Sequence, residues 1–250
     1  MSGHSKWSTI KRQKGANDAK RGATFTRMAN AIMIAVREGG GGDPDSNFRL
    51  RLVLDQARAA NLPKDNIGRA IDKALGKGGG PALESIMYEG FGPSSVAILV
   101  ETITDNRNRT GSEVKSTIEK SGGSLGGPGA VSWMFEKKGV IETDINHEDS
   151  DEFSLKAADF GADDVVVIDE NTVSVLTKTT ELKKIEDQIR AGGYNVKSSD
   201  FDFVAKVGVK LEDIDKVRSV LGMIEKLEDL PDVVKVSSNL DIPESMYELL

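Results

Sequence analysis

The hydrophobic periodicity of this 250-residue chain changes at a run of glycines, and that change limits most strongly how the chain can fold. Before Gly76–Gly80, apolar residues recur every three or four positions, as they do on one face of a helix. After Pro81, short apolar runs alternate with helical stripes, which is typical of strands interleaved with helices. We therefore expect a domain boundary at residue 80.

Residues 1–80 are predicted to form a small helical domain. One apolar stripe comprises Phe25, Met28, Ala29, Ile32 and Val36, and the glycines at 39–42 end it. A second helix is expected over 52–60 and a third after Pro63, which suits a first helical turn. Residues 1–15 carry no such stripe, so we expect them to form an extended arm.

The rest of the chain predicts two interleaved α/β domains. The outer elements are strands at 96–103, 131–135, 203–209 and 233–236, with helices at 114–118 and 214–224; the first helix is expected to begin at a capping box, Thr110–Glu113. Between them, residues 139–198 follow the order βαββαβ of a ferredoxin-like domain. The predicted fold class is α+β: a three-helix domain (1–80), a split ferredoxin-like domain (81–133 with 203–250) and an inserted one (134–202).

Charge is divided unevenly along the chain. Residues 1–80 hold 15 Lys and Arg against 7 Asp and Glu, a net charge of +8. Residues 81–250 hold 18 against 33, a net charge of −15. A basic segment attracts polyanions and an acidic one repels them, so the first domain is the expected contact for nucleic acid.

Several kinds of chemistry find no support in the residues. The chain has no cysteine and only two histidines, His4 and His147, so thiolate chemistry and a histidine-rich metal site are excluded. The glycine-rich stretch at 122–129 lacks the lysine of a phosphate-binding loop and is expected to be a turn. No apolar run is long enough to cross a membrane. We therefore expect a non-enzymatic cytoplasmic protein without cofactor, metal or small-molecule substrate.

The basic arm is the main candidate for nucleic-acid binding. Its cations neutralise phosphates, and Trp7 offers a ring for base stacking. The candidates are Lys6, Trp7, Lys11, Arg12, Lys14, Lys20, Arg21 and Arg27, with Arg49 and Arg51 on the second helix. The alternatives are a solvated terminus, ordinary helix surface for the last two arginines, and a transit peptide for the basic, acid-poor start.

A second candidate is the turn at 104–110, which has the sequence Thr-Asp-Asn-Arg-Asn-Arg-Thr. Asn106, Arg107 and Arg109 would sit where a strand leads into a helix, and backbone amides with arginine side chains can bind an anion there. The alternative is a capped turn with no ligand.

Longer strings resemble a known family. They are Met1–Trp7, Asp18–Gly22, Gly41–Pro44, Arg49–Leu52, Ala59–Asn66, Tyr88–Pro93, Thr104–Thr110 and Ser132–Phe135. In this order they are similar to the YebC/PmpR family over nearly the whole chain. The departures are Pro231, where an acidic residue is usual, and Ser237–Asn239; they bear on partner contacts near the C-terminus.

The resemblance implies a helical domain followed by two α/β domains, with no enzymatic activity or cofactor. It implies either DNA binding in transcription regulation or, as for the mitochondrial relative that activates translation, action on RNA at the ribosome. A third hypothesis, from charge alone, is a protein-interaction module that docks through the acidic α/β domains.

Overall fold

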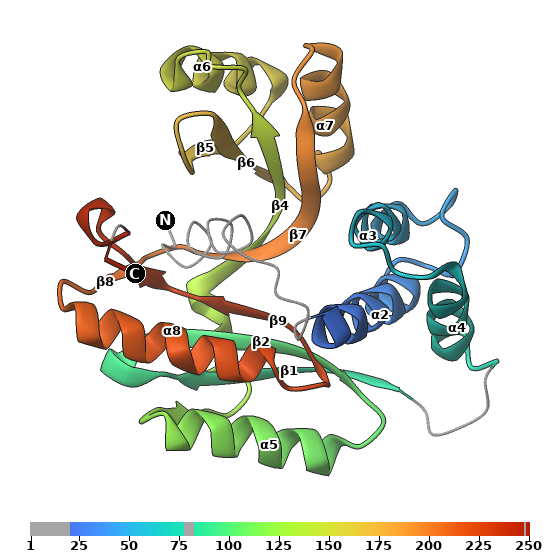
Figure 1. Ribbon diagram of the computed structural model, residues 1–250, viewed down its shortest axis with the longest axis vertical. Coiled ribbons are helices and arrows are strands. Elements are labelled where there is room, and N and C mark those ends of the chain that lie inside the picture. Colours follow the sequence, from blue (N-terminus) through green and yellow to red (C-terminus); the bar gives the residue numbers. More distant parts are fainter. Residues whose placement is uncertain (1–20, 78–82, 248) are drawn as a thin grey trace. The chain divides into compact units, whose positions relative to one another are not determined.

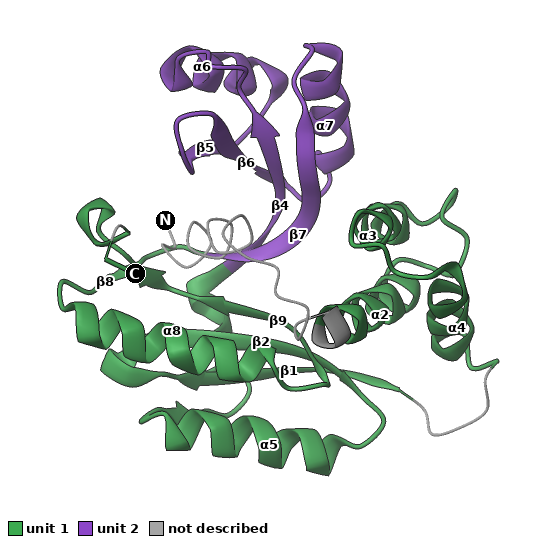
Figure 2. Cartoon of the chain, in the orientation of Figure 1, with its two compact units in different colours: residues 1–135, 205–250 green, residues 136–204 purple. Residues whose placement is uncertain are grey.

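The protein was analysed as a computed structural model that describes residues 21–77, 83–247 and 249–250. The chain forms two compact units (Figure 2). One contains the described residues up to Phe135 together with Ala205–Leu250, and the other contains Glu136–Val204. The predicted α+β class, with helices first and two α/β regions after them, is confirmed (Figure 1).

The helical region begins with α2 (Arg21–Glu38), α3 (Phe48–Ala59) and α4 (Lys64–Ala74). Asn47 caps α3, since its Oδ1 accepts from the Leu50 amide at 2.9 Å, and its Nδ2 donates to the carbonyls of Ala35 and Gly41. The region shares one core with the neighbouring sheet, because Ile103 packs into the same cluster as the helix residues. The helices therefore belong to the first compact unit.

The first unit also holds a four-stranded antiparallel sheet, in the order β3-β1-β2-β9. Its strands are β1 (Glu84–Phe91), β2 (Ala97–Thr104), β3 (Ser124–Leu125) and β9 (Val233–Ser238). The apolar faces of α5 (Arg107–Lys120) and α8 (Ile214–Glu228) pack with the sheet in one buried cluster. The short β8 (Val209–Lys210) and β10 (Leu240–Asp241) pair in parallel beside it.

The structure corrects two of the strand predictions in this unit. Residues 132–134 form a 3-10 turn, η3, rather than a strand, and Phe203 lies in a strand of the other unit. The sheet is completed instead by β1, which the periodicity analysis missed, and by the short β3, which lies in the stretch expected to be a turn. Because β1 exposes most of its first half, its sequence shows no continuous apolar run.

The second unit follows the predicted βαββαβ order. Its elements are β4 (Phe135–Asp144), α6 (Ser150–Phe160), β5 (Asp164–Val167), β6 (Thr172–Lys178), α7 (Leu182–Ala191) and β7 (Val196–Ala205). The sheet order is β5-β6-β4-β7. Phe153, Ile185 and Ile189, from its two helices, are fully buried. The remaining short turns are η2 (Pro93–Ser95) and η4 (Glu244–Met246).

Candidate nucleic-acid interface

Most of the predicted arm lies outside the described residues. This holds for Lys6, Trp7, Lys11, Arg12, Lys14 and Lys20. Arg21 is the first described residue and begins α2. The arm's role in binding therefore stays a prediction.

The three other arginines predicted in the helical region all have partners inside the protein. Arg27 lies 3.9 Å from the Glu228 carboxylate, and Arg49 pairs with Glu38. Arg51 donates to the Pro44 carbonyl, at 3.1 Å from Nε and 3.0 Å from Nη2. The contacts of Arg49 and Arg51 hold the loop between α2 and α3, and that of Arg27 joins α2 to α8, so part of the positive charge counted from the sequence is used within the fold.

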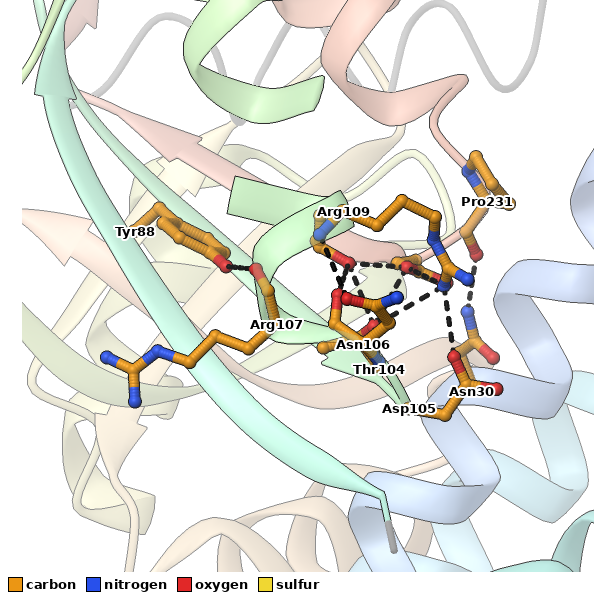
Figure 3. Close-up of polar contacts among 10 residues, drawn as sticks. Asn30, Tyr88, Thr104, Asp105, Asn106, Arg107, Arg109 and Pro231 are labelled. Atoms are coloured by element: carbon orange, nitrogen blue, oxygen red, sulfur yellow. Dashed lines mark hydrogen bonds and ion pairs between the residues drawn. The ribbon is translucent and has the colours of Figure 1, made fainter. Parts of the chain in front are cut away.

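The turn at 104–110 joins β2 to α5 (Figure 3). The helix begins at Arg107, and Asn106 is its cap, since its Oδ1 accepts from the Arg109 amide at 3.1 Å. The predicted capping box at Thr110 is therefore wrong by one turn. Thr110 is instead buried, and its hydroxyl donates to the Asp232 carboxylate.

Asp232, just before β9, is the centre of this cluster. Its Oδ2 accepts from Arg109 Nη2 at 2.6 Å and from the hydroxyls of Thr104 at 3.0 Å and Thr110 at 2.5 Å. Burial alone would raise the pKa of Asp232, but these three donors lower it below its ordinary value. The cluster thus holds an ionised carboxylate against the first turn of α5.

The two arginines of the turn differ in their surroundings. Arg109 is also 3.2 Å from Asp105, so two carboxylates compensate its charge. Arg107 is exposed, and its guanidinium makes no hydrogen bond or ion pair with any residue that the structure describes. Figure 3 shows its side chain pointing away from the Asp232 cluster. Of the two, Arg107 is the cation that remains available to an anion.

Pro231, the family departure, lies in the turn between α8 and β9. Its carbonyl accepts from Asn30 Nδ2 of α2 at 2.7 Å, which ties the helical region to this turn (Figure 3). Any residue at this position would supply that carbonyl. Sequence reasoning missed Asp232, because it lies 122 residues from Thr110 and nothing in the local pattern links the two.

The described residues offer little to a metal. Within 21–77, 83–247 and 249–250, no group of three or more His, Asp or Glu side chains is placed to hold an ion. In the same ranges, no helix has both the length and the apolar character needed to span a bilayer.

The fold and the turn define an α+β protein in which a helical region precedes two four-stranded sheets; the second has the ferredoxin-like order βαββαβ, whereas the first begins with the hairpin β1–β2 and does not. The chain belongs to the TACO1/YebC family: residues 5–77 match the model of the TACO1/YebC N-terminal domain, and residues 83–240 match that of the second and third domain.

Relatives cover almost the full length. A "probable transcriptional regulatory protein" of Chloroflexus aurantiacus is 54% identical over 97% of this chain and 96% of its own. Another with that description, from Desulfotalea psychrophila, is 48% identical over 100% and 99%. A solved structure of a conserved hypothetical protein from Aquifex aeolicus is 37% identical, covers 92% of this chain and 94% of its own, and has a TM-score of 0.82.

Proposed function

We propose that the protein is a non-enzymatic, cytoplasmic nucleic-acid-binding regulator of gene expression and that its basic N-terminal arm makes the principal contact. The observation that carries this is the separation of charge, +8 over residues 1–80 and −15 over residues 81–250. A segment with excess cations binds phosphates and releases counterions, and an acidic remainder directs that contact to one end of the chain.

The pairing of the described cations supports the same assignment. Arg49, Arg51 and Arg58 each contact a carboxylate, so they attract phosphate less strongly than a count of charges suggests. The arm has five cations before residue 21 and only one acid, Asp18. Residues 1–20 thus contribute +4, half of the net charge of the first 80 residues, and Arg107 adds a further cation in the first unit.

We favour RNA, at the ribosome, over duplex DNA as the partner. Sequence-specific DNA readers present Arg, Asn and Gln together on one exposed helix face. The exposed residues of α4 include Asp65 and Asp72 beside Arg69 and Lys73, and the two aspartates would repel phosphates in a groove. Binding by phosphate and shape does not need such a face. The alternatives are the transcriptional role that the relatives' names describe and a protein partner on the acidic domains.

Crosslinking in cells at native expression, followed by sequencing of both DNA and RNA, separates these functions. The proposal expects ribosomal RNA peaks and DNA signal at background. Sharp promoter peaks without ribosomal RNA enrichment would establish the transcriptional role instead. If neither promoter peaks nor ribosomal RNA peaks appear, the protein-interaction hypothesis remains.

Removal of residues 1–15 tests the arm in vitro. The truncated chain should keep its melting temperature and lose most of its affinity for RNA. The salt dependence should also weaken: an arm that contacts about six phosphates gives a slope of log K against log salt of roughly −4 to −5. Unchanged affinity at unchanged stability would remove the arm from the proposal.

A further inference from the structure

Trp133 is a large aromatic side chain left open to solvent. It lies in η3, and 66% of its surface is exposed. Tryptophan is usually largely buried, because its ring offers a large apolar area. An indole that stays exposed in a folded loop is therefore a candidate contact for another molecule.

The backbone around this indole is fixed on both sides. Trp133 Nε1 donates to the Ala130 carbonyl at 3.2 Å, so the polar edge of the ring is already used. The Trp133 carbonyl accepts from Lys206 Nζ at 2.9 Å, and the Met134 carbonyl accepts from the Lys206 amide at 2.9 Å. What remains for a ligand is the apolar surface of the ring.

Glu89, on β1, holds the same loop from within. The residue is 8% exposed, and its carboxylate accepts from the backbone amides of Gly129, Val131 and Ser132, each at 2.8 Å. Three charge-assisted hydrogen bonds to consecutive parts of a loop restrict its motion. A contact residue that is ordered before binding loses little conformational entropy when a ligand arrives.

The charge beside the indole indicates which ligand fits. Lys206 is exposed, and within the described ranges it bonds only to neutral carbonyls, with no carboxylate at ion-pair distance. The next residue, Val207, is 74% exposed. An apolar peptide would use the ring and the valine but not the ammonium group. A nucleotide would use the ring for its base and the ammonium group for its phosphate.

We propose that Trp133 is a stacking platform for an unpaired nucleobase, of RNA or of single-stranded DNA, and that Lys206 binds the adjoining phosphate. This proposal rests on the proposed nucleic-acid binding and adds a second contact to it, in the α/β part of the first unit. It requires a base, whereas the cations of the arm require only phosphates.

Tryptophan fluorescence of the full chain tests the stacking directly. The chain has two tryptophans, so Trp7→Phe leaves Trp133 as the sole tryptophan whose fluorescence is measured. The probes are RNA and DNA strands of mixed sequence, about 12 nucleotides long, and an abasic strand of equal length. Base-bearing strands should quench the emission, and the abasic strand should bind without quenching it. The stronger of the RNA and DNA responses identifies the source of the base.

Affinity measured by anisotropy of the labelled strands gives the second readout. Trp133→Ala should weaken binding of base-bearing strands about tenfold and leave the abasic strand unchanged, whereas Trp133→Phe should retain most of the affinity. Leu155→Ala is a matched control, because Leu155 is 71% exposed in the other unit. All variants should keep the parental melting temperature.

Two failures are distinguishable. If the strands bind but neither quench Trp133 nor respond to Trp133→Ala, the platform is overturned and the proposed function stands. If the parental chain binds no strand at low salt, both proposals are overturned.

Discussion

Two carboxylates of the first unit hold two loops, and they use different donors. Glu89 binds three backbone amides of the loop before Trp133, whereas Asp232 binds side chains, from Arg109, Thr104 and Thr110. Glu89 is buried, and the three donors named above are all uncharged amides. Asp232, by contrast, forms an ion pair with Arg109. Backbone donors fix the path of a loop, while side-chain donors join segments far apart in the sequence. The comparison predicts that the Glu89 loop depends more on its carboxylate than the Asp232 turn does.

Removal of the Glu89 carboxylate should have the largest effect. Glu89→Ala leaves three amides without this acceptor, one buried at Val131 and two partly buried at Gly129 and Ser132, so we expect the free energy of unfolding to fall by about 3 kcal/mol. Urea denaturation measures this. Glu84→Ala, at the exposed start of the same strand, is the control and should change little. Equal stability of the two variants would contradict the role given to Glu89.

The Asp232 turn should respond less. Asp232→Asn keeps an oxygen acceptor and most of the packing but loses the charge that Arg109 faces, so we expect a loss of about 1–2 kcal/mol. Asp229→Asn, an exposed aspartate three residues earlier, is the control. A loss larger than that of Glu89→Ala would reverse the comparison.

Both carboxylates should contribute to acid sensitivity. Burial raises the pKa of Glu89, but the hydrogen bonds from the backbone amides lower it by more, so the pKa lies below its ordinary value of 4.5. The pKa of Asp232 is likewise lowered from 3.8. A lowered folded-state pKa gives stability above the unfolded-state value, which is lost as pH falls through the folded-state pKa. Stability should therefore decline below about pH 4.5. The decline should be shallower in Glu89→Gln; an unchanged slope would show that Glu89 is not responsible.

The two arginines of the turn should separate binding from stability. Arg109→Ala should lower the melting temperature slightly, since Arg109 pairs with Asp232 and Asp105, and should change RNA affinity little. Arg107→Ala should leave the melting temperature unchanged and weaken RNA binding. The sequence alone predicts both arginines as candidate anion ligands. If Arg109→Ala weakens RNA binding as much as Arg107→Ala does, the turn acts as one anion site.

Local patterns identified most of the helices. The stripe from Phe25 to Val36 lies within α2, because a buried helix face repeats at a fixed interval. The predicted start of α5 was wrong because both Asn106 and Thr110 can cap a helix. In the structure the Thr110 hydroxyl donates to Asp232, and Asn106 is the cap.

The candidate site was only partly visible in the sequence. Composition separated the basic segment from the acidic one, and the arginines of the turn were found from their position between a strand and a helix. Nothing in the sequence distinguished Arg107 from Arg109, because the difference is a carboxylate 123 residues away from Arg109. The sequence indicated Trp133 only as part of the family resemblance, because the neighbouring residues do not determine whether a side chain is exposed.

The sequence by itself determined the fold class, the positions of most helices and the division of charge, because periodicity, turn residues and charge depend on neighbours along the chain. The tertiary structure decided which strands share a sheet, which cations are neutralised and which aromatic ring stays exposed. Those properties depend on contacts between distant segments, such as Glu89 with Gly129 and Thr104 with Asp232. Each contact is formed only when the sheet brings its two partners together.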